Sequence, residues 1–203
     1  MLHKNQGSVG EKIRKTIFEQ NFSSISFDDA ISKTYFFHKL AQLVDIPVIY
    51  IDFDLLYSGY LAANILSQNE NVEVLAPKET WKDIIVQTLD KISKSQHLVI
   101  VDSLNGFFSA LIDQKDSGRI INSTILILVS AAQKADSAVV IGSTAKYKKD
   151  DGWVLPGIGR HVVEIQKMNL LTVRKKNATL ELVSVNHDNS VKFATPLDDL
   201  DLV

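Results

Sequence analysis

Residues 98–108 read LVIVDSLNGFF, in which an unbroken aliphatic run from Leu98 to Val101 stops at Asp102. A strand with one face in water alternates apolar and polar residues, whereas a strand covered by helices on both faces is apolar throughout. The run therefore predicts a buried strand of a parallel sheet. The carboxyl ends of such strands border the ligand crevice, which places Asp102 and Ser103 there. These two residues suit a Mg²⁺ site of a nucleotide enzyme. On this segment alone, a strand end followed by a helix cap is the better explanation.

The overall composition is that of an ordinary globular protein. Of the 203 residues, 45% are hydrophobic and 23% are charged, and none is cysteine. The lack of cysteine excludes disulfides, thiolate metal sites and a cysteine nucleophile. The sequence has no apolar segment of membrane-spanning length and no signal-peptide core, so we expect a cytoplasmic protein without a membrane partner.

The charge of the chain is unevenly distributed. The formal net charge is −2, which by itself gives no indication of nucleic-acid binding. Between Lys146 and Lys176, however, eight lysines and arginines face three acidic residues, a balance of +5 that leaves −7 for the rest of the chain. A basic C-terminal third on an acidic body is typical of an electrostatic contact surface, although a solvated hairpin and loop would show the same pattern.

Away from residues 98–108, aliphatic runs alternate with amphipathic segments. Buried strands are predicted at residues 24–27, 46–54, 71–75 and 137–141, and helices at 9–21, 36–44, 57–66, 77–94 and 118–135. An antiparallel meander is predicted from short runs between turn residues at 162–165, 170–174, 179–185 and 191–193.

This order predicts an α/β fold in which a mostly parallel central sheet is flanked by helices and carries antiparallel C-terminal strands. We divide the chain into an N-terminal helical segment, a core domain and an acidic C-terminal tail, at residues 1–23, 24–195 and 196–203.

The junction between the first strand and its helix is where a phosphate-binding loop, GxxxxGK[ST], would stand. Residues 27–34 read FDDAISKT there, and Lys33 and Thr34 match the last two positions of the motif. Phe27 and Ser32 stand where the motif has glycines, whose backbone N–H groups would close around the phosphates. Seen alone, this segment is better explained as a helix start capped by Asp28, Asp29 or Ser32.

Other positions also lack the usual groups of a nucleotide enzyme. Asp28 and Asp29 would place negative charge beside a phosphate. The second strand ends near Asp54, a carboxylate that is able to orient an attacking water but is one methylene shorter than glutamate. The last parallel strand ends in Gly142 and Ser143, neither of which has a side-chain amide to sense a phosphate.

Taken together, four segments resemble the ATPase core of RecA-superfamily recombinases, above all the archaeal RadA type and its paralogs. They are LVIVDSLNGFF, IPVIYIDFD (46–54), the segment AQKADSAVVIGSTAKYKKDDGWVLPGIGRHVVEI (132–165) and LLTVRKKNATLELVSVNHDNSVKF (170–193). Their order and spacing match from Ser24 to Phe193. The resemblance implies a RecA-like P-loop NTPase fold, with Asp54 at the catalytic-glutamate position. It also implies a degenerate nucleotide site at Lys33, Thr34, Asp102 and Ser103.

The departures from this family lie in its catalytic positions, which indicates a pseudo-ATPase. The resemblance then implies a non-catalytic accessory paralog in DNA recombination and repair, which binds a RadA-like recombinase, a RecA-fold paralog or single-stranded DNA and forms homo- or hetero-oligomers. ATP would be a cofactor only if nucleotide binding survives, with Mg²⁺ then held by Thr34 and Asp102. Without such binding, we expect Lys33 or helix capping to hold Asp102.

Three alternatives stay open. One is a RecA-fold scaffold in tRNA modification, similar to the Elongator accessory subunits. Another is a weak residual ATPase that uses Lys33, Thr34, Asp54 and Asp102, and a third is a KaiC-like signalling module. Fold alone does not decide among these functions.

The family resemblance also places a flexible DNA-binding loop at residues 144–159. The expected phosphate contacts and stacking platforms there are Lys146, Lys148 and Lys149, with Tyr147 and Trp153. Asp150 and Asp151 in the same loop weaken this interpretation, and a solvated loop is the alternative.

Overall fold

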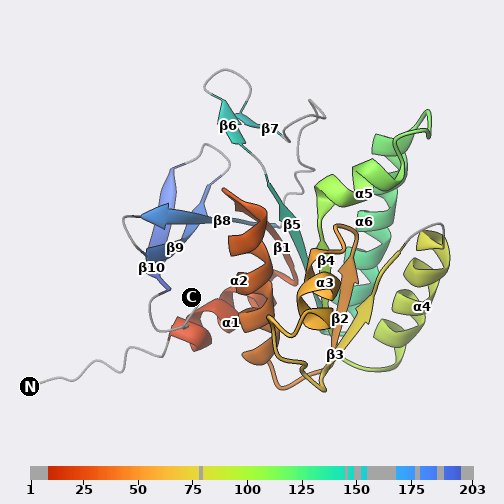
Figure 1. Cartoon of the computed structure of the whole chain (residues 1–203), viewed down its shortest axis with the longest axis horizontal. Coiled ribbons are helices and arrows are strands. Elements are labelled where there is room, and N and C mark those ends of the chain that lie inside the picture. Colours follow the sequence, from red (N-terminus) through yellow and green to blue (C-terminus); the bar gives the residue numbers. More distant parts are fainter. Residues whose placement is uncertain are drawn as a thin grey trace, which may run out of the picture.

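The computed structural model describes residues 9–77, 80–144, 168–176, 179–186 and 190–197, together with the backbone of 146–148 and 152–154. Its centre is an eight-stranded sheet with strand order β10-β9-β8-β1-β5-β4-β2-β3 (Figure 1). The strands are β1 Phe22–Phe27, β2 Val48–Asp52, β3 Val72–Leu75, β4 Leu98–Asp102, β5 Ala138–Ser143, β8 Asn169–Lys176, β9 Thr179–Val185 and β10 Val191–Pro196. From β3 to β8 all neighbours are parallel, and β9 and β10 add the antiparallel edge.

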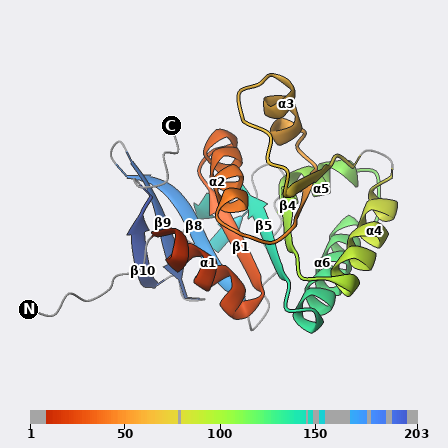
Figure 2. The same ribbon diagram turned by 90° about the horizontal axis from the view of Figure 1, so that it is seen from below.

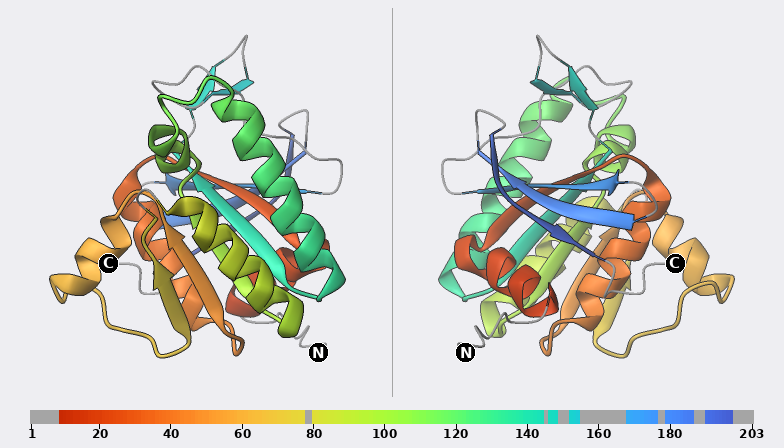
Figure 3. Two further views of the ribbon diagram at one scale, coloured as in Figure 1. Left: turned by 90° about the vertical axis from the view of Figure 1, so that its right-hand side faces the viewer. Right: turned by 90° about the vertical axis from the view of Figure 1, so that its left-hand side faces the viewer.

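Helices cover both faces of the sheet. Figures 2 and 3 show α2 and α6 on opposite faces. The helices are α1 Val9–Gln20, α2 Ala30–Gln42, α3 Leu56–Ala62, α4 Trp81–Lys94, α5 Leu104–Ala110 and α6 Ser117–Lys134. One core cluster joins the sheet to α1, α2 and α3, and a second joins it to α4, α5 and α6.

Strand β4 shows why its sequence is apolar throughout. Leu98 and Ile100 belong to the first cluster, whereas Val99 and Val101 belong to the second, and all four are buried. Alternate residues of a strand point to opposite faces, so each face of β4 needs its own apolar set. The predicted α/β fold, with a mostly parallel sheet and antiparallel C-terminal strands, is thereby confirmed.

Several element boundaries differ from those predicted. Helix α4 starts at Trp81 rather than at Pro77, and α3 ends at Ala62, two residues before Asn64 adopts a left-handed φ of 56°. Helix α5 was expected only as a capped helix after Asp102 and was given no residue range, because seven residues are too few to show a helical period. Strand β10 reaches Pro196, and Leu197 beyond it is buried. The strand predicted at 162–165 lies outside the described residues.

Part of the predicted loop after β5 is a short hairpin. Strands β6 (Lys146–Lys148) and β7 (Gly152–Val154) pair antiparallel, with Tyr147 opposite Trp153 in register. Figure 1 shows the hairpin beyond the carboxyl end of β5. Among the described helices, none has the length and apolar character that a membrane span requires.

The carboxyl ends of β1, β5, β4 and β2 lie along one edge of the sheet. Ser26 of β1 is in register with Ser143 of β5, and Asp52 of β2 is in register with Asp102 of β4. Helices α2 and α5 begin at the same edge, three residues after Phe27 and two residues after Asp102. The candidate site is built from these strand ends.

Candidate functional site

A buried lysine lies at the centre of this edge. Lys33, in the first turn of α2, has a fully buried side chain whose Nζ lies 2.6 Å from Oδ2 of Asp54 and forms a second ion pair with Oδ1 of Asp102. Asp54 follows β2 and Asp102 ends β4, so the strand ends bring three of the predicted site residues together. The expectation that Lys33 holds Asp102 agrees with this contact.

Asp102 is enclosed on all sides. Its second carboxylate oxygen accepts a hydrogen bond from the Tyr50 hydroxyl, and its carbonyl accepts bonds from the backbone N–H groups of Phe53 and Asp54. The next residue, Leu55, adopts a left-handed φ of 60° and immediately precedes α3. This corner turns the chain so that the Asp54 carboxylate reaches Lys33.

Two glycines provide the space for the Lys33–Asp54 pair. A Cβ atom on Gly106 would lie 2.2 Å from Oδ1 of Asp54. A Cβ atom on Gly142 would lie 2.5 Å from the Phe37 ring and 3.3 Å from Cδ of Lys33. The sequence suggested that Gly142 was merely a lost sensor position, whereas the structure shows that it admits the helix that carries Lys33.

The cluster has unusual electrostatics. Burial lowers the pKa of Lys33, but the charges of Asp102 and Asp54 more than offset this, so its pKa is raised above the ordinary value and the ammonium persists. Burial raises the pKa of Asp102 to about 6, against the opposing effect of Lys33. Burial, with Asp102 next to it, also raises the pKa of the Tyr50 hydroxyl far above its usual range.

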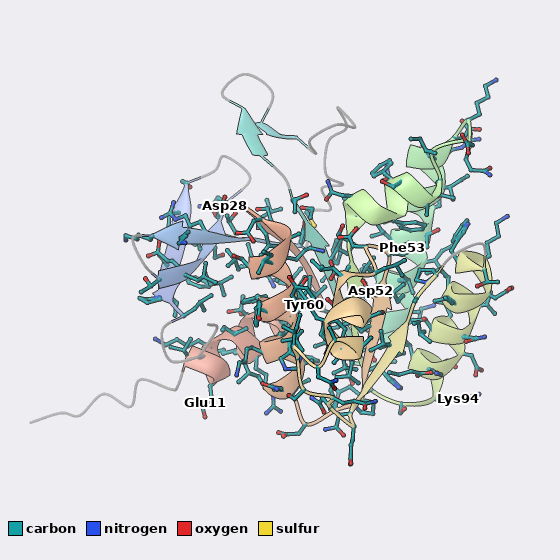
Figure 4. All side chains as sticks on the ribbon, viewed as in Figure 1. Glu11, Asp28, Asp52, Phe53, Tyr60 and Lys94 are labelled. Atoms are coloured by element: carbon teal, nitrogen blue, oxygen red, sulfur yellow. The ribbon has the colours of Figure 1, made fainter. Side chains whose placement is uncertain are left out.

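The start of α2 is capped by the protein itself. Oδ1 of Asp29 accepts a hydrogen bond from the Ser32 N–H at 2.7 Å, and Oδ2 accepts one from the Ser32 hydroxyl at 2.8 Å. Asp28, labelled near the start of α2 in Figure 4, accepts a 3.3 Å bond from the Lys175 N–H. Because α2 begins at Ala30, the chain between β1 and α2 is too short to encircle a phosphate group.

The remaining predicted residues are occupied by local contacts. Thr34 is buried, and its hydroxyl donates to the Ala30 carbonyl at 2.9 Å. Ser103 is buried too and caps α5 by accepting a bond from the Gly106 N–H. Within the described part of the chain, no group of three or more His, Asp or Glu residues is arranged to hold a metal. In this arrangement, Lys33, Thr34 and Asp29 do not fit a magnesium–nucleotide complex.

Two buried polar residues of β2 escaped prediction. Asp52 accepts hydrogen bonds from the N–H and hydroxyl of Ser58 on one oxygen, and its other oxygen has no partner among the described residues (Figure 4). Tyr50 stacks on Tyr57 with ring centroids 4.0 Å apart and binds Asp102. The sequence did contain a signal for Tyr50. A tyrosine in an otherwise aliphatic buried strand needs a hydrogen-bond partner for its hydroxyl, which indicates a polar group nearby.

The predicted nucleic-acid contacts are placed only in part. The backbone of Lys146, Tyr147 and Lys148 lies in β6 and that of Trp153 in β7. Their side chains, and Lys149 altogether, lie outside the described residues.

Comparisons with known proteins identify the fold. No protein-family model and no curated protein matches the sequence. Among solved structures, the RadB recombinase resembles this chain with a TM-score of 0.63 at 14% identity, over 91% of this chain and 92% of that one. A DnaB-like replicative helicase, described with its interactions with primase, resembles it with a TM-score of 0.55 at 13% identity, over 87% of this chain and 56% of the helicase. At such low identity the likeness defines the fold alone, and the fold of this chain is RecA-like.

Proposed function

We propose that this protein is a RecA-fold pseudo-ATPase that acts by binding rather than by hydrolysing ATP. One observation carries the proposal: both groups that would attract a nucleotide phosphate are already bound by acidic side chains of the same chain. The N-terminus of α2 is capped by Asp29, and the ammonium of Lys33 is paired with Asp54 and Asp102.

The energetics of displacement support this proposal. A helix N-terminus attracts anions through its free N–H groups and its partial positive charge. The Asp29 carboxylate already accepts the Ser32 N–H and places its own negative charge there. A phosphate that took Lys33 from its partners would leave Asp102 as a fully buried carboxylate without an ammonium. Breaking a buried pair in this way costs about 3–5 kcal/mol. The phosphate would also stand beside the negative charges of Asp28 and Asp29.

Two observations support a binding role in recombination as part of this proposal. The RadB recombinase shares the fold over nearly the whole chain. The lysines of the β6–β7 hairpin stand in a segment of net positive charge. We therefore propose an accessory paralog that associates with a RadA-like recombinase or another RecA-fold protein, with single-stranded DNA as a further ligand.

The test of catalysis is steady-state phosphate release with Mg²⁺ and ATP, with and without single-stranded DNA. We expect wild type and Lys33→Ala to release phosphate at the same background rate. Turnover that exceeds background in wild type and disappears in Lys33→Ala would contradict the proposal and support the residual ATPase.

The partner is tested separately by affinity capture, followed by reconstitution. A purified RadA-like recombinase should co-sediment with the protein equally well with and without ATP. Capture of tRNA-modification subunits, without binding to the recombinase, would instead support the Elongator-like scaffold.

A further inference from the structure

We propose that the pocket between α2 and residues 61–68 binds a small organic carboxylate, one that carries a single negative charge on an aromatic or aliphatic body. The pocket has a volume of about 730 Å³, which is in the range of sites for small molecules. Of the described residues that line it, none is Lys33, Asp54 or Asp102. The inference is therefore independent of the proposed function and goes beyond it.

One wall of the pocket is a single face of α2. Four residues line it at positions i, i+3, i+4 and i+7 of the helix, which is the spacing of one helical face. They are Tyr35, His38, Lys39 and Gln42. The opposite wall is the end of α3 and the chain after it, and Figures 1 and 3 show α3 beside α2. The pocket thus follows α2 from its second turn onward.

The opposite wall is held in place by the chain's own hydrogen bonds. Asn64 adopts a left-handed φ of 56° after α3, and the N–H group of Ile65 then donates to the Tyr60 carbonyl at 2.9 Å. Further along, the Asn69 side chain donates to the Ala41 carbonyl of α2 at 3.4 Å. A ligand would therefore enter a pocket that is already formed, without the entropic cost of ordering its walls.

The charge of the pocket is positive. Lys39 lines it with a half-buried side chain, and its ammonium has no ion-pair or hydrogen-bond partner among the described residues. None of the described lining residues is acidic. Burial, and to a lesser degree the charge of Lys39, lower the pKa of His38, so His38 adds no second positive charge. One cation without a carboxylate in the same lining favours a ligand with one negative charge.

The nitrogen atoms of the His38 ring are already engaged. Nδ1 lies 3.2 Å from the Tyr57 hydroxyl, and Nε2 lies 3.0 Å from the amide nitrogen of Gln42. In a neutral imidazole one nitrogen donates and the other accepts, so these two contacts use both. His38 therefore belongs to the base of the pocket, and the ammonium of Lys39 is the group on the α2 wall that is free to bind an anion.

Uncharged donors line the other side of the pocket. The side chains of Asn64, Ser67 and Gln68 line it, and none of them is hydrogen-bonded to another described residue. Amide and hydroxyl groups are able to donate to the second oxygen of a carboxylate whose first oxygen is bound by the Lys39 ammonium. A carboxylate can thereby be bound from both walls.

The pocket also has an apolar part. Leu61 and Ile65 line it, and Ile65 is 54% exposed. Tyr35 adds an aromatic ring, whose centroid lies 6.2 Å from that of Tyr60. Covering this surface with a hydrocarbon chain or an aromatic ring is favourable, whereas an inorganic anion covers none of it. The lining therefore suits a carboxylate with an apolar body rather than a bare ion.

The experiment is a titration of the full chain with sodium phenylacetate, followed by the backbone amide resonances in NMR. We expect saturable shifts at Lys39 and residues 61–68, with a dissociation constant on the order of 1 mM for a ligand of this size. Phenylacetamide lacks the charge and acetate lacks the ring, so each should bind at least about tenfold more weakly. Phenyl phosphate should bind no more tightly than phenylacetate, because its second negative charge meets no second cation.

Two variants test the assigned contacts. Lys39→Met keeps the apolar stem and should weaken phenylacetate binding at least about tenfold, because the hydrogen bond to a charged group is lost. Lys134→Met is the matched control, since it removes the same charge from α6, on the opposite face of the sheet, and should bind like wild type. Ile65→Ser should weaken the binding of phenylacetate but not that of acetate, which has no ring to contact the apolar part.

The proposal is overturned if phenylacetate produces no saturable shift at the pocket, or if Lys39→Met binds it as tightly as wild type. Equal binding of phenylacetamide would remove the role of the charge, and tighter binding of phenyl phosphate would contradict the assignment to carboxylates. Phosphate release from ATP is a separate measurement, so the pocket and the pseudo-ATPase proposal can fail separately.

Discussion

The Nζ atom of Lys33 lies 2.6 Å from Oδ2 of Asp54, although 21 positions separate the two residues in the chain. Lys33 follows β1 and Asp54 follows β2, and these strands are separated in the sheet by β5 and β4. The contact therefore reaches past the end of β4, where Asp102 provides the second carboxylate. A salt-bridge network thus joins the first turn of α2 to the carboxyl ends of β2 and β4.

Loss of the central ammonium should destabilise the fold strongly. Lys33→Met keeps the apolar stem but leaves the buried Asp102 and the partly buried Asp54 without their cation. We expect the free energy of unfolding to fall by about 3–5 kcal/mol, measured by urea denaturation. Lys39→Met on the same helix is the control, and its change should stay within about 0.5 kcal/mol. A loss below about 1 kcal/mol in Lys33→Met would show that the network contributes little.

The stability of the protein should carry a pH dependence from Asp102. Its pKa is about 6 in the folded protein against an ordinary value of 3.8, so the folded state binds the proton more tightly than the unfolded state. The resulting stabilisation is fully present below pH 3.8 and is lost as the pH rises through 6. Asp102→Asn removes this titration.

The free energy of unfolding of wild type, relative to Asp102→Asn, should therefore increase on acidification from pH 7 to pH 4, by at most about 1.4 kcal/mol per pH unit. Denaturation curves of both proteins across this range measure the difference. A difference that shrinks on acidification would mean that Lys33, rather than burial, dominates the pKa of Asp102.

Position 106 should tolerate no side chain. In Gly106→Ala the new carbon would lie 2.2 Å from Oδ1 of Asp54 and 2.9 Å from the backbone carbonyl carbon of Phe53. We expect a loss of about 1–3 kcal/mol in the free energy of unfolding. Gly59→Ala is the matched control, because its Cβ in α3 would meet nothing within 4 Å and alanine favours a helix by roughly 1 kcal/mol. Equal effects of the two substitutions would contradict the steric argument.

The β6–β7 hairpin should bind single-stranded DNA through its lysines. Three lysines that neutralise three phosphates give a log–log salt slope of about −2, from about 0.7 per phosphate. Fluorescence anisotropy with a labelled oligonucleotide at several salt concentrations measures the slope. Alanine at Lys146, Lys148 and Lys149 should flatten it, and Trp153→Ala should weaken binding by roughly 1–3 kcal/mol if a base stacks there.

The control for the hairpin is a triple alanine variant at the exposed residues Lys12, Lys15 and Lys82, which loses the same net charge from other parts of the surface. It should bind like wild type. Equal weakening of DNA binding in both triple variants would indicate only a response to overall charge. If wild type shows no salt-dependent DNA binding, the hairpin is not a nucleic-acid site and the protein acts through protein partners alone.

Much of the fold followed from short-range patterns. The aliphatic run that ends at Asp102 predicted a strand covered on both faces, and β4 places its alternate residues in two separate clusters. The bounds of α5 were not predicted, because Ser103 caps a helix of only seven residues. The start of α4 was placed too early because Pro77 also suits the turn before a helix.

The candidate site was predictable as a set of residues but not as an arrangement. Lys33, Asp54 and Asp102 were each singled out by their place at a strand end or helix start. A capped start of α2 and a Lys33–Asp102 contact were each expected as one of two alternatives, whereas the contact between Lys33 and Asp54 was not expected. Asp29 stands four positions before Lys33. A side chain at that position either accepts hydrogen bonds from the N–H groups of the helix start or leaves them free for a ligand, and the sequence pattern is the same in both cases.

The sequence by itself determined that buried parallel strands end in carboxylates beside a single lysine, because burial and strand polarity are set by local side-chain patterns. Only the tertiary structure decided that this lysine is held by those carboxylates. The strand order β1-β5-β4-β2 brings residues 21 and 69 positions apart into contact. The space for that contact depends on glycines at 106 and 142, far away in the chain. Such distances are set by packing between elements, which no local pattern encodes.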